Sequence, residues 1–487
     1  MTIARIVLSI IFVAGSVAAS RAAPASNRLN IVVILADDLG GSDLGCYGAD
    51  LHETPNLDRL AHQAMRFTTA YSASPVCTPT RAALMTGKHP ARLGMTIWAE
   101  AAADPPRFKR PRPLIPATAE HNLSHAETTI AAQLQAAGYL TALVGKWHLG
   151  DPLHYPETHG FDINIGGTLW GAPQTFFYPY RGRGMYGSEF RYVPHLEFGK
   201  SGEYLTDRLT DEALNVIDRA GQQPFFLYLA HHAVHTPIEA KAADVSHFEA
   251  KLSAGQHHRN PTYAAMTKSL DDSVGRVLKR LDERGLAERT LVIFTSDNGG
   301  YIGIDRNRKL PVTDNYPLRS GKGSVYEGGV RVPLMVRWPG TTPAGAVCHE
   351  PVMTTDLFFT LLAAAGLKPS ATTAADGVNL QPVLSDPTAS LNRDALYFHY
   401  PHYYETTSPV SAIRAGSWKL LHYYEDDRAE LYNLADDPRE QQDLAKQQPK
   451  KVQDLRGRLH DWLAAAGARL PTKNPEYQPP AAKRAAK

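Results

Sequence analysis

The feature that most constrains the fold is a short apolar run, rich in β-branched residues, that recurs along the chain. Its first copy reads N-I-V-V-I-L-A at residues 30–36, and similar runs stand at 139–144, 225–230 and 291–295. Such runs are typical of strands buried on both faces, as in parallel sheets covered by helices. Helical patterns separate the runs, so we predict an α/β fold with a large, mixed, mostly parallel sheet flanked by helices.

Two of the intervening helices are well marked. Thr128 or Thr129 can cap a helix that ends at Gly138, because a threonine hydroxyl accepts from free backbone N–H groups and glycine adopts the left-handed conformation. A longer helix is predicted over about 263–284, where apolar residues recur at helical spacing before Gly285.

The sequence changes character after Leu367. An Ala/Thr-rich stretch at 370–376 leads into short strand-like segments, expected at 396–400, 412–414, 418–423 and 430–434, and then a helical pattern at 452–465. We predict a catalytic domain over 28–367 and a smaller C-terminal α+β domain with an antiparallel sheet over 368–470. The Pro/Ala/Lys-rich tail at 471–487 is expected to fray.

The first 23 residues have the layout of a secretory signal peptide, with Arg5, an apolar stretch at 6–14 and small residues up to Ala22 or Ala23. The apolar run is short for a membrane span, which favours an exported, periplasmic or secreted protein over a retained N-terminal anchor. The chain has 51 basic and 49 acidic residues, and loss of Arg5 and Arg21 with the signal leaves 49 of each. A formally neutral chain gives no argument for binding nucleic acid or a membrane surface.

Residues with acidic, basic, imidazole or amide side chains stand at the end of each predicted strand. They are Asp37 and Asp38 after the first, Lys146 and His148 after the second, His231, His232 and His235 after the third, and Asp297 and Asn298 after the fourth. Ligands of α/β sheets bind beyond the carboxyl ends of the strands, so these side chains should meet at one edge. The Asp and Asn oxygens favour calcium or magnesium. Each motif alone is more often a turn, but their pairing across two buried strands reverses this and favours a divalent cation. We assign no role to His231 or His232.

Cys77 lies in the segment P-V-C-T-P-T-R-A-A-L-M-T-G-K. A lone cysteine is usually a small buried thiol, and a Cys–His nucleophile pair is a second possibility, but neither accounts for the residues that follow. Three cysteines are too few for a disulfide-stapled fold or a Cys-rich zinc site. If Cys77 is used in chemistry, Cys46 and Cys348 are left as a potential pair.

The segment C-T-P-T-R at 77–81, continued by A-A-L-M-T-G-K, resembles the signature of the type I sulfatases, a formylglycine-dependent family in the alkaline-phosphatase-like superfamily. The resemblance covers nearly the whole mature chain and includes L-A-D-D-L-G (35–40), G-K-W-H-L-G (145–150), A-V-H-T-P (233–237), S-D-N-G-G (296–300) and L-R-S-G-K-G (318–323). Thr80 stands where serine is frequent in the family, and it keeps the hydroxyl.

The resemblance implies that Cys77 is oxidised to formylglycine by a formylglycine-generating or sulfatase-maturating enzyme. It also implies one bound calcium ion, held by Asp37, Asp38, Asp297, Asn298 and the residue derived from Cys77. Arg81 would fix the nucleophile, and the sulfate would be surrounded by Lys146, His148, His235 and Lys322. His148 would assist the hydrated aldehyde, and His235 would protonate the leaving oxygen. A hydrated aldehyde has two hydroxyls, one to attack sulfur and one to expel sulfate afterwards, whereas a thiol has no such exit.

The predicted function is release of inorganic sulfate from a small-molecule or oligosaccharide sulfate ester. The run H-Y-P-H-Y-Y at 399–404 and Trp98 could form a sugar-binding rim, which favours a carbohydrate, although packing explains such aromatics equally well. Three alternatives stay open. They are an arylsulfatase acting on small aryl sulfates, a phosphonate or phosphodiester hydrolase on the same scaffold, and a catalytically silent binding homologue.

Overall fold

The computed structural model describes residues 28–104, 112–369 and 376–479, so the predicted signal peptide lies outside the described residues. Its centre is a nine-stranded sheet in the order β11-β2-β10-β9-β1-β8-β4-β5, with β12 paired to β2. The strands are β1 (Asn30–Ala36), β2 (Met65–Tyr71), β4 (Leu140–Gly145), β5 (Ile163–Ile165), β8 (Phe225–Ala230), β9 (Thr290–Ser296), β10 (Arg331–Arg337), β11 (Val347–Cys348) and β12 (Val352–Met353). Within it only β10 pairs antiparallel to its neighbours, which confirms the mixed, mostly parallel sheet.

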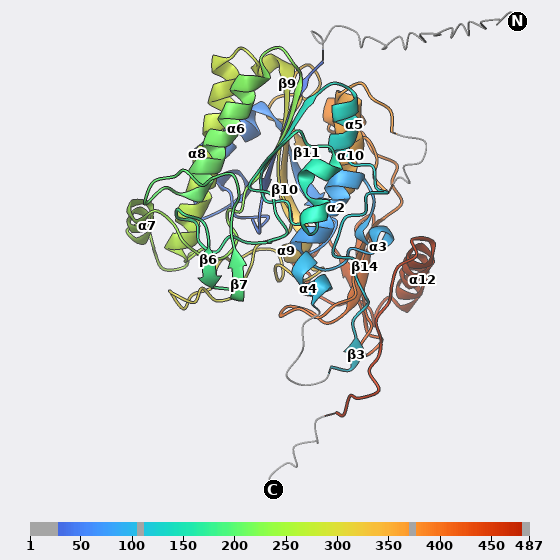
Figure 1. Cartoon of the computed structure of the whole chain (residues 1–487). Coiled ribbons are helices and arrows are strands. Elements are labelled where there is room, and N and C mark those ends of the chain that lie inside the picture. The colour runs from blue at the N-terminus through green and yellow to red at the C-terminus, as the bar shows by residue number, and fades with distance from the viewer. Residues whose placement is uncertain (1–27, 105–111, 370–375, 480–487) are drawn as a thin grey trace, which may run out of the picture.

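Helices cover both faces of this sheet (Figure 1). One layer contains α6 (Leu205–Ala220) and α8 (Pro261–Glu283), with α1 (Pro55–Gln63) and α7 (Ala242–Glu249) packed on α8. The opposite layer contains α2 (Cys77–Thr86), α5 (Ile130–Ala136) and α10 (Thr354–Ala364). In β1, Val32 and Ile34 belong to the first core, whereas Ile31 and Val33 belong to the second. Burial on both faces explains why the run is apolar without alternation.

The predicted helices form with the caps that local sequence provides. Thr129 accepts a hydrogen bond from the backbone of Ala132, and Gly138 takes a positive φ of 87° just after α5. The long helix starts two residues earlier than predicted, because the side chain of Asn260 caps it.

A second, four-stranded antiparallel sheet lies beside the first. It consists of β13 (Leu396–Tyr400), β14 (Val410–Ala415), β15 (Trp418–Tyr423) and β16 (Ala429–Asn433). One face packs on α12 (Pro449–Ala465) through Leu420 and Leu459 (Figure 1), and the other packs on the first sheet through Leu421 and Tyr71. The prediction of a C-terminal α+β unit with an antiparallel sheet is confirmed.

Two features differ from the sequence expectations. Residues Thr472–Lys473, part of the segment expected to fray, form β17 and pair with β3 (Leu114–Ile115), while 480–487 lie outside the described residues. The sequence pattern also gave no sign of β10, because Pro333 interrupts it. In the structure this strand shifts register between Val332 and Leu334, which accommodates the proline.

Short elements complete the described chain. They are α3 (Pro90–Leu93), α4 (Ala99–Ala103), α9 (Glu327–Val330), α11 (Gln381–Ser385), the 3-10 turns η2 (Gly45–Tyr47), η3 (Pro152–His154), η4 (Pro156–His159) and η5 (Ala287–Arg289), and the hairpin β6 (Gly182–Gly184) and β7 (Gly187–Arg191). Cys46, Cys77 and Cys348 are all free. Across the three described ranges, no helix has the length and apolar character needed to cross a membrane.

Lys419 of β15 links the second sheet to the first unit by a buried charge interaction. Its Nζ lies 2.8 Å from Glu327 Oε1 and 3.0 Å from Glu440 Oε1, and all three side chains are buried. Burial raises the pKa of Glu440 to about 7. Burial also acts on Glu327, but the Lys419 ammonium outweighs it and lowers the pKa of Glu327 to about 2. The cation therefore keeps at least one buried carboxylate charged.

Replacement of this cation should be strongly destabilising. We expect Lys419→Met to lower the free energy of unfolding by about 3–5 kcal/mol, because it leaves buried carboxylates without their counter-charge. Equilibrium urea unfolding followed by circular dichroism measures this. Lys279→Met is the control, since the Lys279 side chain is mostly exposed and its Nζ lies 3.5 Å from Glu283, and its curve should match the parent. Equal stability of both variants would show that the buried cation is dispensable.

Candidate active site

The carboxyl ends of β1, β4 and β9 bring three predicted residues together at one edge of the sheet. Asp37, Lys146 and Asp297 follow these strands and are fully buried. Lys146 Nζ donates to both carboxylate oxygens of Asp37, at 3.0 and 2.8 Å. The backbone N–H of Asp38 donates to Asp297 Oδ1 at 3.2 Å, with Asp38 in a left-handed conformation at φ 61°. Such strained conformations are common at functional sites.

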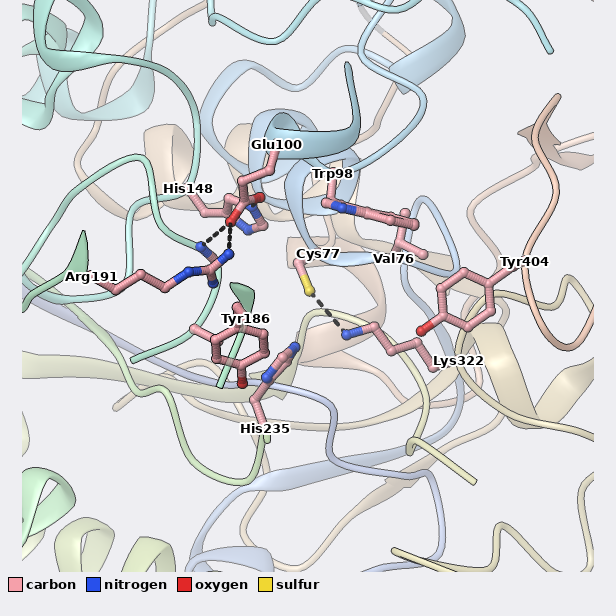
Figure 2. Close-up of a pocket in the computed structure, with 12 residues that line it drawn as sticks. Val76, Cys77, Trp98, Glu100, His148, Tyr186, Arg191, His235, Lys322 and Tyr404 are labelled. Carbon is pink, nitrogen blue, oxygen red and sulfur yellow. Dashed lines mark hydrogen bonds and ion pairs between the residues drawn. The ribbon is translucent and has the colours of Figure 1, made fainter. Parts of the chain in front are cut away.

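Cys77 is the first residue of α2, and Figure 2 shows its Sγ directed toward Lys322 Nζ. The sulfur lies 3.6 Å from Asp37 Oδ1, 3.9 Å from Asp38 Oδ1 and 3.5 Å from Lys322 Nζ. The positive end of the helix dipole favours negative charge at this position. Burial nevertheless raises the pKa of the Cys77 thiol despite Lys146 and Lys322. The unmodified thiol is therefore a poor nucleophile at neutral pH, which weighs against a Cys–His pair.

The residues that follow Cys77 hold its loop in place. Thr80 Oγ1 accepts from the backbone N–H of Ser74 at 3.1 Å and donates to the carbonyl of the same residue at 3.0 Å. Arg81 donates from Nε to Asp297 Oδ2 at 2.9 Å and from Nη1 to the carbonyl of Lys146 at 3.0 Å. Burial opposes ionisation of Asp297, but Arg81 holds the pKa of that carboxyl well below its usual range. The Thr80 hydroxyl therefore fixes the backbone of Ser74 before the helix, and Arg81 fixes the helix against Asp297.

Lys322 and His235 approach the cluster from two other loops. Lys322 Nζ lies 2.7 and 2.8 Å from the two carboxylate oxygens of Asp38. His235 Nε2 lies 3.5 Å from Asp38 Oδ2, and its Nδ1 lies 2.8 Å from the carbonyl of Thr236. Burial, assisted by the Lys322 charge, lowers the pKa of His235 to about 3, so the free imidazole is neutral at pH 7.

The oxygen donors fit a hard divalent cation. Asp37, Asp38, Cys77 and His235 each place a potential ligand atom within 4.8 Å of the others. Asn298 Oδ1 is buried and has no hydrogen-bond partner within the described ranges. Burial raises the pKa of Asp37 to about 8, and repulsion from Asp297 adds to the effect. A calcium ion would neutralise the repelling carboxylates of Asp37 and Asp297, and it would give the unpaired amide oxygen of Asn298 a partner.

Glu100 is a functional residue that the sequence analysis missed. It lies in α4, where its Oε2 is 2.5 Å from His148 Nε2 and its Oε1 accepts from the backbone N–H of Gly171 at 2.9 Å. A carboxylate can only accept, so Nε2 carries the proton, and the buried Nδ1, which has no partner among the described residues, keeps its lone pair. Burial lowers the pKa of His148 to about 4. His148 is thus held as a neutral, oriented base.

No local signal pointed to Glu100, because A-E-A-A-A is an ordinary helical turn. Gly171, which donates to Glu100, leaves room for the ring of His148. A Cβ at this position would lie 2.3 Å from Cε1 of His148.

Cys77 lies in a cavity of about 190 Å³ (Figure 2). The other lining residues are Val76, Trp98, Glu100, His148, Gly171, Ala172, Tyr186, Arg191, His235, Lys322 and Tyr404. An adjoining hollow of about 420 Å³ shares Tyr186, His235, Lys322 and Tyr404 with it and extends to Tyr301 and Asp305. Arg191 packs over Tyr186, with its guanidinium carbon 4.2 Å from the ring centroid. Aromatic rings therefore line both the cavity and the hollow beside it.

The expected aromatic rim is only partly present. Trp98 and Tyr404 line the cavity and contact each other with ring centroids 5.7 Å apart. The other rings of the run H-Y-P-H-Y-Y, including Tyr400 and His402, are buried in packing. His231 is also buried and lies 2.9 Å from Ser273 Oγ.

Comparison with known proteins gives a consistent result. The sulfatase family model matches residues 29–367, and the model described as N-sulphoglucosamine sulphohydrolase, C-terminal, matches 321–468. The chain is 37% identical to N-acetylgalactosamine-6-sulfatase of Canis lupus familiaris over 76% of this chain and 68% of the relative. It is 32% identical to a sulfatase of Formosa agariphila over 91% of this chain and 89% of the relative.

The crystal structure of Ps i-CgsB superposes with a TM-score of 0.75 at 33% identity, covering 90% of this chain and 93% of that one. The family match spans well over half of the residues, and the matched region includes every predicted catalytic and metal-binding residue, from Asp37 to Lys322. The chain therefore belongs to the sulfatase family, and its activity is the hydrolysis of sulfate esters.

Proposed function

We propose that this sulfatase releases sulfate from a carbohydrate sulfate ester, with a formylglycine made from Cys77 by a maturation enzyme and with one calcium ion. The observation that carries the proposal is the position of Cys77, at a helix N-terminus in an aromatic cavity, between Lys322 and the carboxylates of Asp37 and Asp38. Export through the predicted signal peptide at residues 1–23 completes the proposal.

Asp37, Asp38, Asp297 and Asn298 would hold the calcium ion. When present, calcium supplies positive charge to the sulfate oxygens, and formylglycine supplies hydroxyls in place of the thiol. Lys146 and Lys322 bring two more positive charges to the same edge, each already paired with one carboxylate. Charge that develops on the sulfate oxygens is thereby met by groups fixed before the reaction.

Proton transfer falls to the two histidines. The neutral Nδ1 of His148 is free to accept a proton from the hydroxyl nucleophile, because Glu100 occupies Nε2. His235 Nδ1 donates to the carbonyl of Thr236, so its Nε2 must first take up a proton before it can protonate the leaving oxygen. The negative charge of a bound sulfate ester favours that protonated form.

The cavity supports a sugar substrate. Trp98, Tyr186 and Tyr404 present aromatic surface around the opening, and the adjoining hollow offers room for a neighbouring ring. Aromatic faces with nearby polar groups suit carbohydrate rings. Two related proteins support this choice, since Ps i-CgsB was crystallised with k-i-k-neocarrahexaose and another relative is an N-acetylgalactosamine-6-sulfatase.

The nucleophile and the substrate class can be tested together. In protein from a host that makes formylglycine, the tryptic peptide 67–81 should be lighter by about 18 Da than its cysteine form. This protein should release sulfate from sulfated galactose or galactosamine oligosaccharides, measured by ion chromatography. Cys77→Ala should lose at least about 10³-fold in kcat, because no nucleophile remains. Turnover of aryl sulfates only would contradict the carbohydrate assignment, and full activity with unmodified cysteine would contradict the nucleophile.

Metal removal should abolish turnover. We expect a chelator to inactivate the enzyme and Ca²⁺ to restore it, since hard oxygen donors favour calcium over zinc. Asn298→Ala should require at least about tenfold more Ca²⁺ for half-recovery, because it removes one ligand. Recovery with Zn²⁺ alone, at two ions per chain, would instead indicate a phosphohydrolase-type centre.

Glu100 should act by positioning His148. We expect Glu100→Gln to lower kcat by about 10²–10⁴-fold with little change in KM, since the imidazole loses its fixed tautomer. The acid limb of the kcat profile should move to lower pH, because the carboxylate no longer favours the protonated imidazole. Glu189→Gln is the matched control, as Glu189 contacts Arg191 at 3.1 Å. A fall in kcat of equal size in both variants would refute the assignment.

A further inference from the structure

Three histidines gather in loops beside the sheet, outside the catalytic cavity. His125 is exposed and precedes α5, His154 ends η3, and His159 ends η4. One ring nitrogen of each lies within 4.8 Å of the others. The ring centroid of His125 is 4.3 Å from that of His154 and 5.0 Å from that of His159. No step of the proposed reaction uses these side chains.

The buried member of this trio lacks a partner. His159 is only 3% exposed, and its Nε2 has no hydrogen-bond partner among the described residues. A buried ring nitrogen left unpaired costs free energy unless something else satisfies it. Burial, assisted by repulsion from the other two rings, lowers the pKa of His159 to about 4. At neutral pH this imidazole is therefore a neutral ligand.

The second member is fixed in the tautomer that a metal requires. His154 Nδ1 lies 2.8 Å from the carbonyl oxygen of Leu123, which can only accept. Nδ1 therefore carries the hydrogen, and the lone pair is on Nε2. Histidines that bind metals commonly donate their other N–H to a carbonyl in this way.

We propose that His125, His154 and His159 bind one zinc ion, with water as the fourth ligand. Three imidazole nitrogens without a carboxylate suit tetrahedral Zn²⁺ and offer little to Ca²⁺. His125 is exposed and can turn its ring toward the ion at small cost. This inference is independent of the proposed calcium site, because the two sites share no residue and differ in ligand type.

The position of the trio gives the ion a structural effect. Trp147, between the site residues Lys146 and His148, donates from Nε1 to the carbonyl of His154 at 2.8 Å and packs on the ring of His159. A bound zinc ion joins this segment to the loop that carries His125. Zinc thus stabilises the loop that holds Lys146 against Asp37 and His148 in the cavity.

Isothermal titration with Zn²⁺, in excess Ca²⁺ to keep the calcium site filled, tests the proposal. We expect one Zn²⁺ per chain, with affinity at least about tenfold weaker in His125→Ala and in His154→Gln. His121→Ala is the matched control, since His121 is a partly exposed histidine that pairs with Asp151, and it should bind as the parent does. Zinc should raise the Tm of the parent and the control but not that of His125→Ala.

Two results of the titration would overturn the site. One is the absence of stoichiometric zinc binding by the parent, and the other is undiminished binding by both His125→Ala and His154→Gln. Equal Tm values without zinc show that the variants fold, which is expected for the exposed His125. In zinc-soaked crystals, an anomalous peak between the three imidazoles supports the proposal, and zinc found only at Asp37 and Asp38 refutes it.

Discussion

Mutual repulsion among buried carboxylates is the constraint on which the rest of this structure depends. Asp37, Asp38 and Asp297 are buried at one edge of the sheet and are balanced by Lys146, Lys322 and Arg81. Each cation comes from a different segment, so the site forms only when strands, loops and α2 are all in place. A cluster of this charge density is costly to assemble unless it is paired, and it is suited to gain a divalent cation.

The residues of the signature around Cys77 are held in place mainly by contacts with this charged cluster. Arg81 spans from Asp297 to the carbonyl of Lys146, and Thr80 closes the loop before the helix. These contacts place the first residue of α2 in the cavity while burial keeps its thiol protonated. The buried, protonated thiol is poorly suited to direct catalysis, which agrees with the formylglycine that we propose at Cys77.

The C-terminal unit takes part in the site as well as in stability. Tyr404 lines the cavity, and Thr406 Oγ1 donates to the carbonyl of Lys322 at 2.8 Å. Lys419 pairs with Glu327, which begins α9 directly after the loop of Lys322. The second sheet therefore supports the loop that carries Lys322, so both units contribute contacts to one site.

The sequence encodes the buried strands, the polar residues at their ends and the signature at Cys77 locally, because each is a pattern of neighbouring residues. It therefore predicted the α/β class and a set of residues that the fold brings together, from Asp37 to Lys322. The folded chain was needed to find that Glu100 contacts His148, that Arg191 and Tyr186 line the cavity, and that β10 accommodates Pro333. The physical reason is that these features depend on contacts between segments far apart along the chain, which no local spacing encodes.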